Sequence, residues 1–338
     1  MFSLFALMYF DFAMPLTLFA VTLAATFLND KVERKLKITF EEREFGVKDA
    51  VLLVTAISVA VSLMVFVPQM AIMTMFLFAY AALLFIFTYI FSDLRRIKAQ
   101  LFCAGFFTVS FIAATVSLFN MSVLGGLSAY GAAAFYCMLG FSFIALTYEE
   151  TRTKTGRRWY LAFLPSALFI ILYVFYSGSP IWFPFLLNMY GILFAILITL
   201  YLGTLFTWKT TLIFAGLLTV ADVILVLITG TMVSAATHVS ALRLPVLVIM
   251  PTVPVITTSW GILYMSLGLG DFFFAGLITV QTCKKYGRQL ALLAAVAMAT
   301  SFFIFEAVIL NFNLRAFPGT LMIICGWLPL LLLKDLKT

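Results

Sequence analysis

The chain has 338 residues, of which 64% are hydrophobic and only 10% are charged. Because a soluble globular protein carries about 25% charged residues, this composition excludes an ordinary water-soluble domain and places much of the surface in lipid. The net charge is +7. Lys and Arg stand in short connections between apolar runs and do not gather on one face, so nucleic-acid binding is not indicated.

The apolar runs are continuous and about 20 residues long, which is the length a helix needs to cross the hydrocarbon layer. Backbone groups in lipid must be paired within the protein, and continuous runs favour helices over the alternating strands of a barrel. The sequence therefore predicts an all-α polytopic integral membrane protein. Eleven segments are expected, at 4–28, 50–68, 71–91, 101–119, 122–147, 159–177, 181–206, 211–229, 255–280, 289–310 and 317–333.

Positive charge falls on every second connection between these segments. The basic connections are 29–49, 93–98, 152–158, the stretch around Lys209, 284–288 and the C-terminal end. The positive-inside rule then predicts an outer N-terminus and a cytoplasmic C-terminus. No Lys or Arg precedes the first apolar run, so we expect an uncleaved first span in place of a signal peptide.

Four acidic residues fall inside predicted spans, where ionisable groups are costly and usually face a protein interior or a water-filled cavity. They are Asp11, Asp222, Asp271 and Glu306. Asp11 lies in the first outer turns of its span, where we expect water to be near. Glu306 lies toward the outer end of its span, where we expect a structural hydrogen bond or an outward-facing side chain.

Asp222 and Asp271 lie at matched depth in neighbouring antiparallel segments. Asp222 comes 13 residues after Lys209, and Asp271 comes 13 residues before Lys284. At about 1.5 Å rise per residue, both carboxyl groups lie about 20 Å from the same membrane face. Equal depth on adjacent helices predicts a paired-carboxylate site.

Two such carboxyl groups in a low-dielectric site cannot readily both ionise, so we expect them to share one proton. One aspartate can then accept a proton from water while the other donates one to a peptide carbonyl group. A proton or cation relay in a transporter or channel uses buried acids in the same way. The spacing alone leaves both interpretations open.

Two glycines before Asp271 favour proteolysis. Gly268 and Gly270 lack Cβ atoms, which lets another backbone approach closely, as an unwound substrate would have to do. Pro318 opens the last segment, where proline is also a common first residue of a helix. The functional interpretation of that stretch is an extended region that pairs with substrate.

The stretch Gly268-Leu269-Gly270-Asp271 resembles the second motif of the GxGD intramembrane aspartyl proteases, which include presenilin, signal peptide peptidase and their archaeal relatives. The first motif of that family is Tyr-Asp, and here it reads Ala221-Asp222. The family's Pro-Ala-Leu motif opens its last helix, and here it reads Pro318-Gly319-Thr320. The charge-derived orientation resembles signal peptide peptidase more than presenilin.

The resemblance covers roughly 182–338 and implies a bundle of about nine helices. Nine segments counted back from the end begin at about residue 71, so either the first two segments are an N-terminal addition or the expected count of eleven is too high. We divide the chain accordingly into N-terminal membrane segments (1–70), N-terminal bundle helices (71–206) and a catalytic region (207–338). A prokaryotic, archaeal-type cell membrane is implied.

The implied activity is hydrolysis of transmembrane substrate helices within the bilayer, without metal or cofactor. Asp222 and Asp271 carry over as catalytic residues. The substrate-binding positions that carry over are Gly268, Leu269, Gly270, Pro318, Gly319 and Thr320. Because Ala221 replaces the motif tyrosine, a protein that binds membrane helices without cleaving them remains an alternative.

Other protease chemistries fit poorly. His238 is the only histidine, which excludes an HExxH zinc site, and we expect it to be an ordinary loop residue. The four cysteines show no metal-type spacing and are expected to be reduced packing residues.

Overall fold

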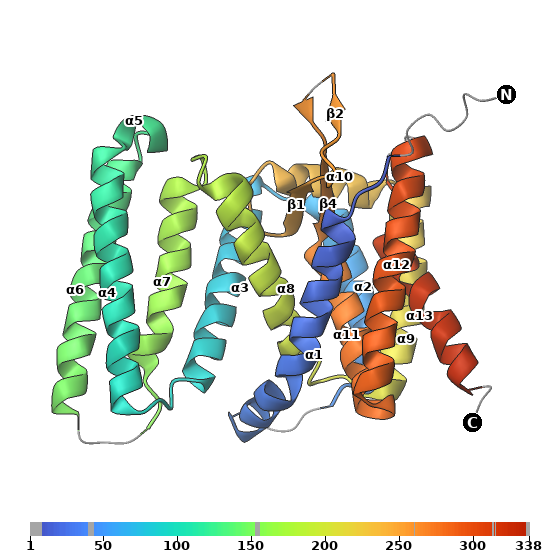
Figure 1. Ribbon diagram of the computed structural model, residues 1–338, viewed down its shortest axis with the longest axis horizontal. Coiled ribbons are helices and arrows are strands. Elements are labelled where there is room, and N and C mark those ends of the chain that lie inside the picture. Colours follow the sequence, from blue (N-terminus) through green and yellow to red (C-terminus); the bar gives the residue numbers. More distant parts are fainter. Residues whose placement is uncertain are drawn as a thin grey trace. The chain divides into compact units, whose positions relative to one another are not determined.

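The computed structural model describes residues 9–39, 44–152, 156–259, 261–312, 314 and 316–335. Several charged residues of the predicted loops (Arg43, Lys154, Arg315 and Lys337) and the start of the first predicted segment lie outside these ranges. The chain forms two compact units (Figure 1). The first unit combines Met1–Gln69 with Tyr190–Thr338, and the second unit is Met70–Met189. The first two helices therefore belong to the same unit as the C-terminal helices.

The protein is a multi-pass integral membrane protein, as predicted. Within the described residues, nine helices are long and apolar enough to cross a membrane. They are α1 (Ala13–Thr39), α2 (Val47–Met64), α3 (Gln69–Ile90), α4 (Arg96–Phe119), α6 (Ser128–Thr151), α7 (Trp159–Tyr176), η1 with α8 (Trp182–Leu186 and Leu187–Leu202), α9 with η2 (Trp208–Val223 and Ile224–Ile228) and α12 (Arg288–Phe312).

Two further helices complete the set of predicted segments. They are α11 (Leu269–Tyr286), which carries one acidic and two basic side chains, and α13 (Gly319–Asp335), which is shorter. Each of the eleven predicted apolar segments thus holds one of these helices. The short helices α5 (Met121–Leu124) and α10 (Thr231–Ser240) lie in connections.

Two predicted boundaries are wrong. α1 continues to Thr39, so the basic residues expected in a loop from 29 onward lie on its last turns. The segment predicted at 255–280 becomes helical only at Leu269, because antiparallel strands precede it. β1 (Leu247–Pro251) pairs with β4 (Tyr264–Gly268), and β2 (Thr257–Thr258) pairs with β3 (Gly261–Ile262). This hairpin departs from the otherwise helical class.

α11 is the central helix of the first unit. Every residue from Phe272 to Thr282 is buried, and α1, α9, α12 and α13 all contact this helix. Packing is tight at Gly276, where a Cβ atom would lie 2.6 Å from Cγ2 of Thr199. Because neighbouring helices and not lipid surround α11, it can carry polar groups that a lipid-facing span could not.

Basic residues of the first unit gather at one end, which we call the basic end. Lys284 Nζ lies 2.8 Å from Glu33 Oε2, which ties α1 to α11. Lys285 Nζ lies 4.5 Å from the ring centroid of Trp208, which ties α11 to α9. The opposite end carries the β1–β4 hairpin, and we call it the hairpin end (Figure 1). Within this unit, the predicted alternation of charge agrees with the structure.

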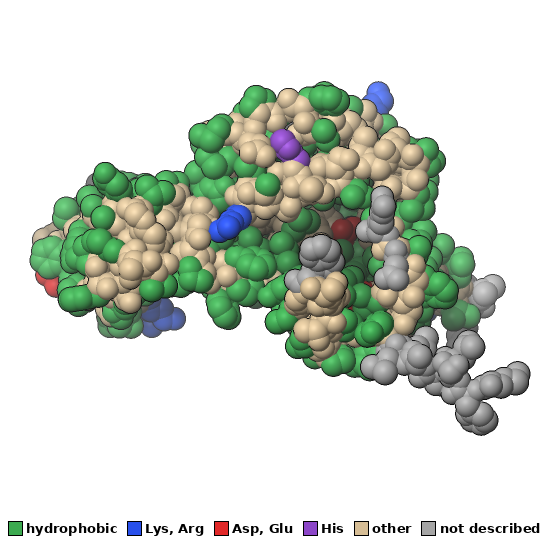
Figure 2. All heavy atoms as spheres, turned by 90° about the horizontal axis from the view of Figure 1, so that it is seen from above, with side chains coloured by type: hydrophobic (Ala, Val, Ile, Leu, Met, Phe, Trp, Pro, Cys, Tyr) green, Lys and Arg blue, Asp and Glu red, His purple; other side chains and the backbone are tan. Residues whose placement is uncertain are grey.

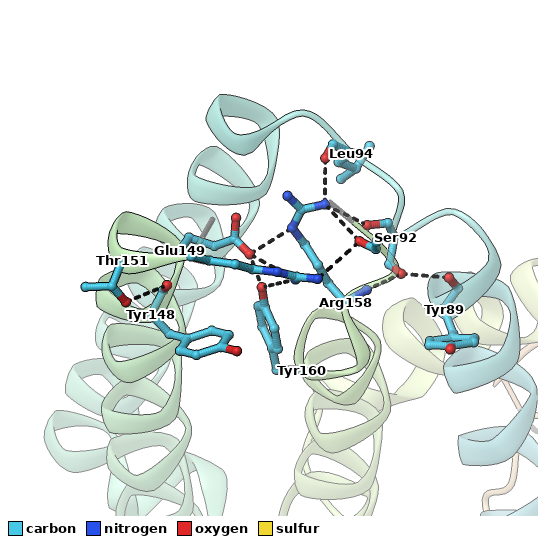
Figure 3. A network of polar contacts seen from close by, with 10 residues as sticks. Tyr89, Ser92, Leu94, Tyr148, Glu149, Thr151, Arg158 and Tyr160 are labelled. Carbon is cyan, nitrogen blue, oxygen red and sulfur yellow. Dashed lines mark hydrogen bonds and ion pairs between the residues drawn. The ribbon is translucent and has the colours of Figure 1, made fainter. Parts of the chain in front are cut away.

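The second unit contains a buried ion pair where α6 meets α7 (Figure 3). Arg158 Nε donates to Glu149 Oε1 at 2.8 Å, and the Tyr160 hydroxyl donates to the same oxygen. Arg158 also donates to the Leu94 carbonyl at 2.6 Å, and its backbone N–H donates to Ser92 Oγ at 2.8 Å. The Arg158 guanidinium thus joins the end of α6 to the connection between α3 and α4.

Removing the acid from this pair should destabilise the protein. Glu149→Ala leaves the Arg158 charge buried without its partner, which costs about 3–5 kcal/mol in other proteins. We expect a large drop in the thermal unfolding temperature of the purified protein. Its neighbour Glu150 is exposed, so Glu150→Ala should change the unfolding free energy by less than about 0.5 kcal/mol. Equal effects of the two substitutions would contradict this account.

Candidate active site

Asp222 lies where α9 changes its helical geometry. Its side chain is buried, and the π-helical turn η2 follows directly, with the Thr229 N–H donating to the Ile224 carbonyl at 2.9 Å. Gly230 then takes a left-handed conformation at φ 66° and starts α10. Such π-helical turns often mark functional sites, because the wider turn redirects the side chains beside it.

Asp271 lies in the first turn of α11. β4 runs straight into this helix, with Gly268 as the last strand residue and the N-cap. The Asp271 carboxyl group folds back toward this N-cap, so that a Cβ atom on Gly268 would lie 3.3 Å from Asp271 Oδ2. The local sequence therefore holds Asp271 at the junction of strand and helix.

The two aspartates lie at the same level, as predicted. The rings of Trp208 and Tyr286, at the basic ends of α9 and α11, are 5.3 Å apart. Asp222 follows Trp208 along α9 by nearly the same stretch of chain as Asp271 precedes Tyr286 along α11. At about 1.5 Å per residue, the carboxyl groups lie about 21 and 22 Å from that end.

Two consecutive residues at the start of α13 contact both acids. Thr320 donates twice to Oδ2 of Asp222, from its hydroxyl at 2.6 Å and its N–H at 3.2 Å. A Cβ atom on Gly319 would lie 2.5 Å from Oδ1 of Asp271. The two carboxyl groups therefore flank one short stretch of backbone.

The close approach of the α13 backbone to the Asp271 carboxyl group requires glycine at position 319. Any side chain there would overlap the Asp271 carboxyl group in its observed position. Only a residue without Cβ lets the α13 backbone come this near.

Both aspartates line one cavity of about 730 Å³ that lies within the first unit. Its walls come from α10, β4, the hairpin-side half of α12 and the start of α13. Seen from above, the protein is hollowed here, and an acidic side chain is visible at the floor of the hollow (Figure 2). The cavity gives water a way to reach carboxyl groups that lie deep in a membrane protein.

One edge of β4 faces this cavity. The Thr252 N–H donates to Leu263 at 3.1 Å, and the Leu269 N–H donates to Val246 at 3.0 Å. Because ladder bonds of an antiparallel pair fall on every second residue, the odd-numbered residues of β4 bond β1. Ser266 therefore directs its N–H and carbonyl groups away from β1. Its side chain is exposed and lines the cavity.

The predicted substrate-binding residues have different positions. Gly268 and Gly319 line the cavity. Leu269 is buried, Gly270 is exposed with nothing near its missing Cβ, and Pro318 is buried. Thr320 is buried and donates to Asp222.

Sequence reasoning missed three parts of the site. The connection at 230–254 contains α10 and β1, and His238 lies on α10, not in a loop. The residues of β4 were predicted to be helical. Pro251 in β1 and Gly261 in β3 are signals against a helix in this part of the chain. Glu306 was expected to be bonded or outward-facing, but it is buried and lines the cavity.

The donors at the site are oxygen atoms of a carboxyl pair. Among the described residues, no group of three His, Cys, Asp or Glu side chains is placed to hold a metal ion. Compared with known proteins, the chain matches no family model, and no curated protein matches it. Conclusions about chemistry therefore depend on the geometry of the site itself.

Proposed function

We propose that this protein is an intramembrane aspartic endopeptidase that hydrolyses transmembrane substrate helices with Asp222, Asp271 and one water molecule. One observation carries the proposal. Two acids from neighbouring helices line the same cavity at one depth, and consecutive residues of α13 touch both of them.

The hydrogen bonds indicate which aspartate is the general base and which is the general acid. Asp222 receives two bonds from Thr320 at the N-terminus of α13. Two hydrogen bonds to a carboxyl oxygen favour its ionised form. We therefore assign Asp222 as the general base and Asp271 as the proton-bearing acid.

In the first step, Asp222 removes a proton from water while the water oxygen attacks the scissile carbonyl carbon. Asp271 donates its proton to the carbonyl oxygen, and a neutral gem-diol forms. In the second step, the C–N bond breaks. Asp222 returns its proton to the leaving nitrogen, and Asp271 takes a proton back from the diol. No covalent enzyme intermediate is required.

The resemblance to GxGD proteases supports this assignment through Gly268, Gly270 and Asp271. The fold we propose is a bundle like that of presenilin and signal peptide peptidase, with α1 and α2 as additions. The hairpin end would then lie outside and the basic end would be cytoplasmic. The motif tyrosine is absent at Ala221, and Thr320 supplies a hydroxyl to Asp222 in this chain.

A substrate helix must unwind before water can reach its backbone. Each backbone group exposed in lipid costs up to several kcal/mol if it stays unpaired. We propose that the unwound segment adds as a strand to the cavity-facing edge of β4, at Ser266. Strand addition pairs backbone groups regardless of side chains. The edge lies just before Gly268, the N-cap of the helix that carries Asp271.

Replacing either aspartate should abolish cleavage. Purified protein is mixed with a single-span test substrate, and fragments are separated by mass. We expect Asp222→Asn and Asp271→Asn each to lower kcat/KM by about 10²–10⁴-fold, because each removes one proton-transfer group. The exposed Glu44→Gln is the matched control and should leave the rate unchanged.

Two results would contradict the proposal. If the unmodified protein cleaves nothing but moves protons into liposomes in an aspartate-dependent way, it is a transporter. If it retains substrate helices without producing fragments or moving protons, it is a binding protein.

The Thr320 hydroxyl should matter for turnover. Thr320→Val removes a hydrogen bond to a charged group, which is worth about 1.5–3 kcal/mol. We expect kcat to fall about 10- to 100-fold. Thr320→Ser keeps the hydroxyl and should retain most of the rate. Similar losses in both variants would instead point to a packing role for the side chain.

The proposed pairing of substrate with the free edge of β4 can be tested at the N–H group of Ser266. Ser266→Pro removes the cavity-facing N–H without removing a bond to β1, and proline is tolerated at the edge of a sheet. Losing one backbone bond to substrate, worth about 1 kcal/mol, should lower kcat/KM roughly fivefold or more. Ser266→Ala keeps the N–H and should cleave normally. Unchanged cleavage by Ser266→Pro would exclude pairing at this position.

A further inference from the structure

We propose that Glu306 forms a subsite of this cavity that selects a Lys or Arg side chain of the substrate, close to the cleaved bond on its hairpin side. The inference rests on the proposed function, and it names a feature of the substrate.

Glu306 is a buried acid without a partner. It lies on α12 with 1% of its surface exposed, and it lines the same cavity as Asp222 and Asp271. Neither of its carboxyl oxygens has a hydrogen-bond partner among the described residues. Buried polar groups are nearly always bonded, and leaving one without a partner is costly. An acid kept in this state points to a partner that arrives with a ligand.

The neighbouring acid cannot serve as that partner. Asp11 caps α1, where it accepts bonds from the N–H groups of Ala13 at 2.9 Å and Met14 at 3.4 Å. It also accepts one from the Val253 N–H at 2.6 Å. These three backbone donors occupy the Asp11 carboxyl group. Although we expected water beside Asp11, its side chain is fully buried.

The described lining of the cavity carries acidic side chains and no basic ones. Its described lining residues include three acids, Asp222, Asp271 and Glu306, and none of them is Lys, Arg or His. Asp11 adds a fourth acid nearby. A cationic side chain entering here gains attraction from Glu306, and an acidic side chain is repelled.

Position along the helices places the subsite next to the cleaved bond. α11 and α12 meet at Gly287, so depth can be counted from one level. Asp271 precedes Gly287 on α11, and Glu306 follows Gly287 on α12. The stretch of helix from Gly287 to Glu306 is about one turn longer than the stretch from Gly287 to Asp271. At about 1.5 Å per residue, Glu306 lies about 4–5 Å nearer the hairpin end. An extended chain rises about 3.3 Å per residue, so the subsite serves a residue one or two positions from the bond.

Lys and Arg fit this site better than short donors. Charge-assisted hydrogen bonds are roughly twice as strong as neutral ones, and an isolated buried carboxylate gains most from a cation. Their long apolar stems can follow the apolar walls of the cavity while the charged end reaches the acid.

The test uses the purified protein and a series of single-span substrates that differ at one residue. Each of the three positions on the hairpin side of the cleaved bond is made Leu, Lys or Glu in turn. We expect the best Lys substrate to have a kcat/KM at least about tenfold above its Leu counterpart, and the Glu substrate to be the poorest. Glu306→Gln should bring all three to similar rates, and the exposed Glu44→Gln should keep the preference.

The outcomes separate this inference from the proposed function. Equal cleavage of all substrates by the unmodified protein overturns the subsite and leaves proteolysis standing. A Lys preference that survives Glu306→Gln also overturns it. Absence of cleavage of every substrate, or cleavage that persists in Asp222→Asn, overturns the proposed function itself. If Glu306→Gln does not fold, equal cleavage of the Leu, Lys and Glu substrates by the unmodified protein still overturns the subsite.

Discussion

The N-terminus of α13 is the contact on which the site depends. Thr320 binds Asp222 with two hydrogen bonds, and Gly319 presses its backbone against the carboxyl group of Asp271. α9 and α11 bring the acids to one level, but α13 holds the two carboxyl groups on either side of its first turn. A helix N-terminus is suited to this task, because its free N–H groups and its dipole both favour nearby negative charge.

Polar groups elsewhere in the described structure are largely paired. The Arg158–Glu149 pair is completed by backbone carbonyls and a tyrosine hydroxyl, and Asp11 receives three N–H groups. Among the described residues, buried side-chain atoms without a hydrogen-bond partner occur at Asn29, Ser128, His238 and Glu306, and of these only Glu306 lines the cavity. A buried acid with both carboxyl oxygens unpaired is costly in a protein surrounded by lipid, so its position in the cavity supports a site that receives a polar ligand.

The structure also accounts for two departures from the motifs that the sequence resembles. Gly319 stands where the resembling motif has alanine, and a Cβ atom there would overlap Asp271. Thr320 replaces a leucine where a hydroxyl reaches Asp222. These two consecutive residues contact different acids, and together they fix the positions of the Asp222 and Asp271 carboxyl groups.

The sequence by itself determined the helical membrane class, the eleven segments, the gathering of basic residues at one end of the first unit and the shared depth of Asp222 and Asp271. Each of these depends on composition or on position along a helix axis, and a helix advances by a constant rise per residue. Only the tertiary structure decided that Thr320 faces Asp222, that Glu306 faces the cavity, and that 264–268 is a strand. Rotation of a helix about its axis, and the pairing of a short apolar stretch, are set by contacts with segments far away in the chain, which no local pattern records.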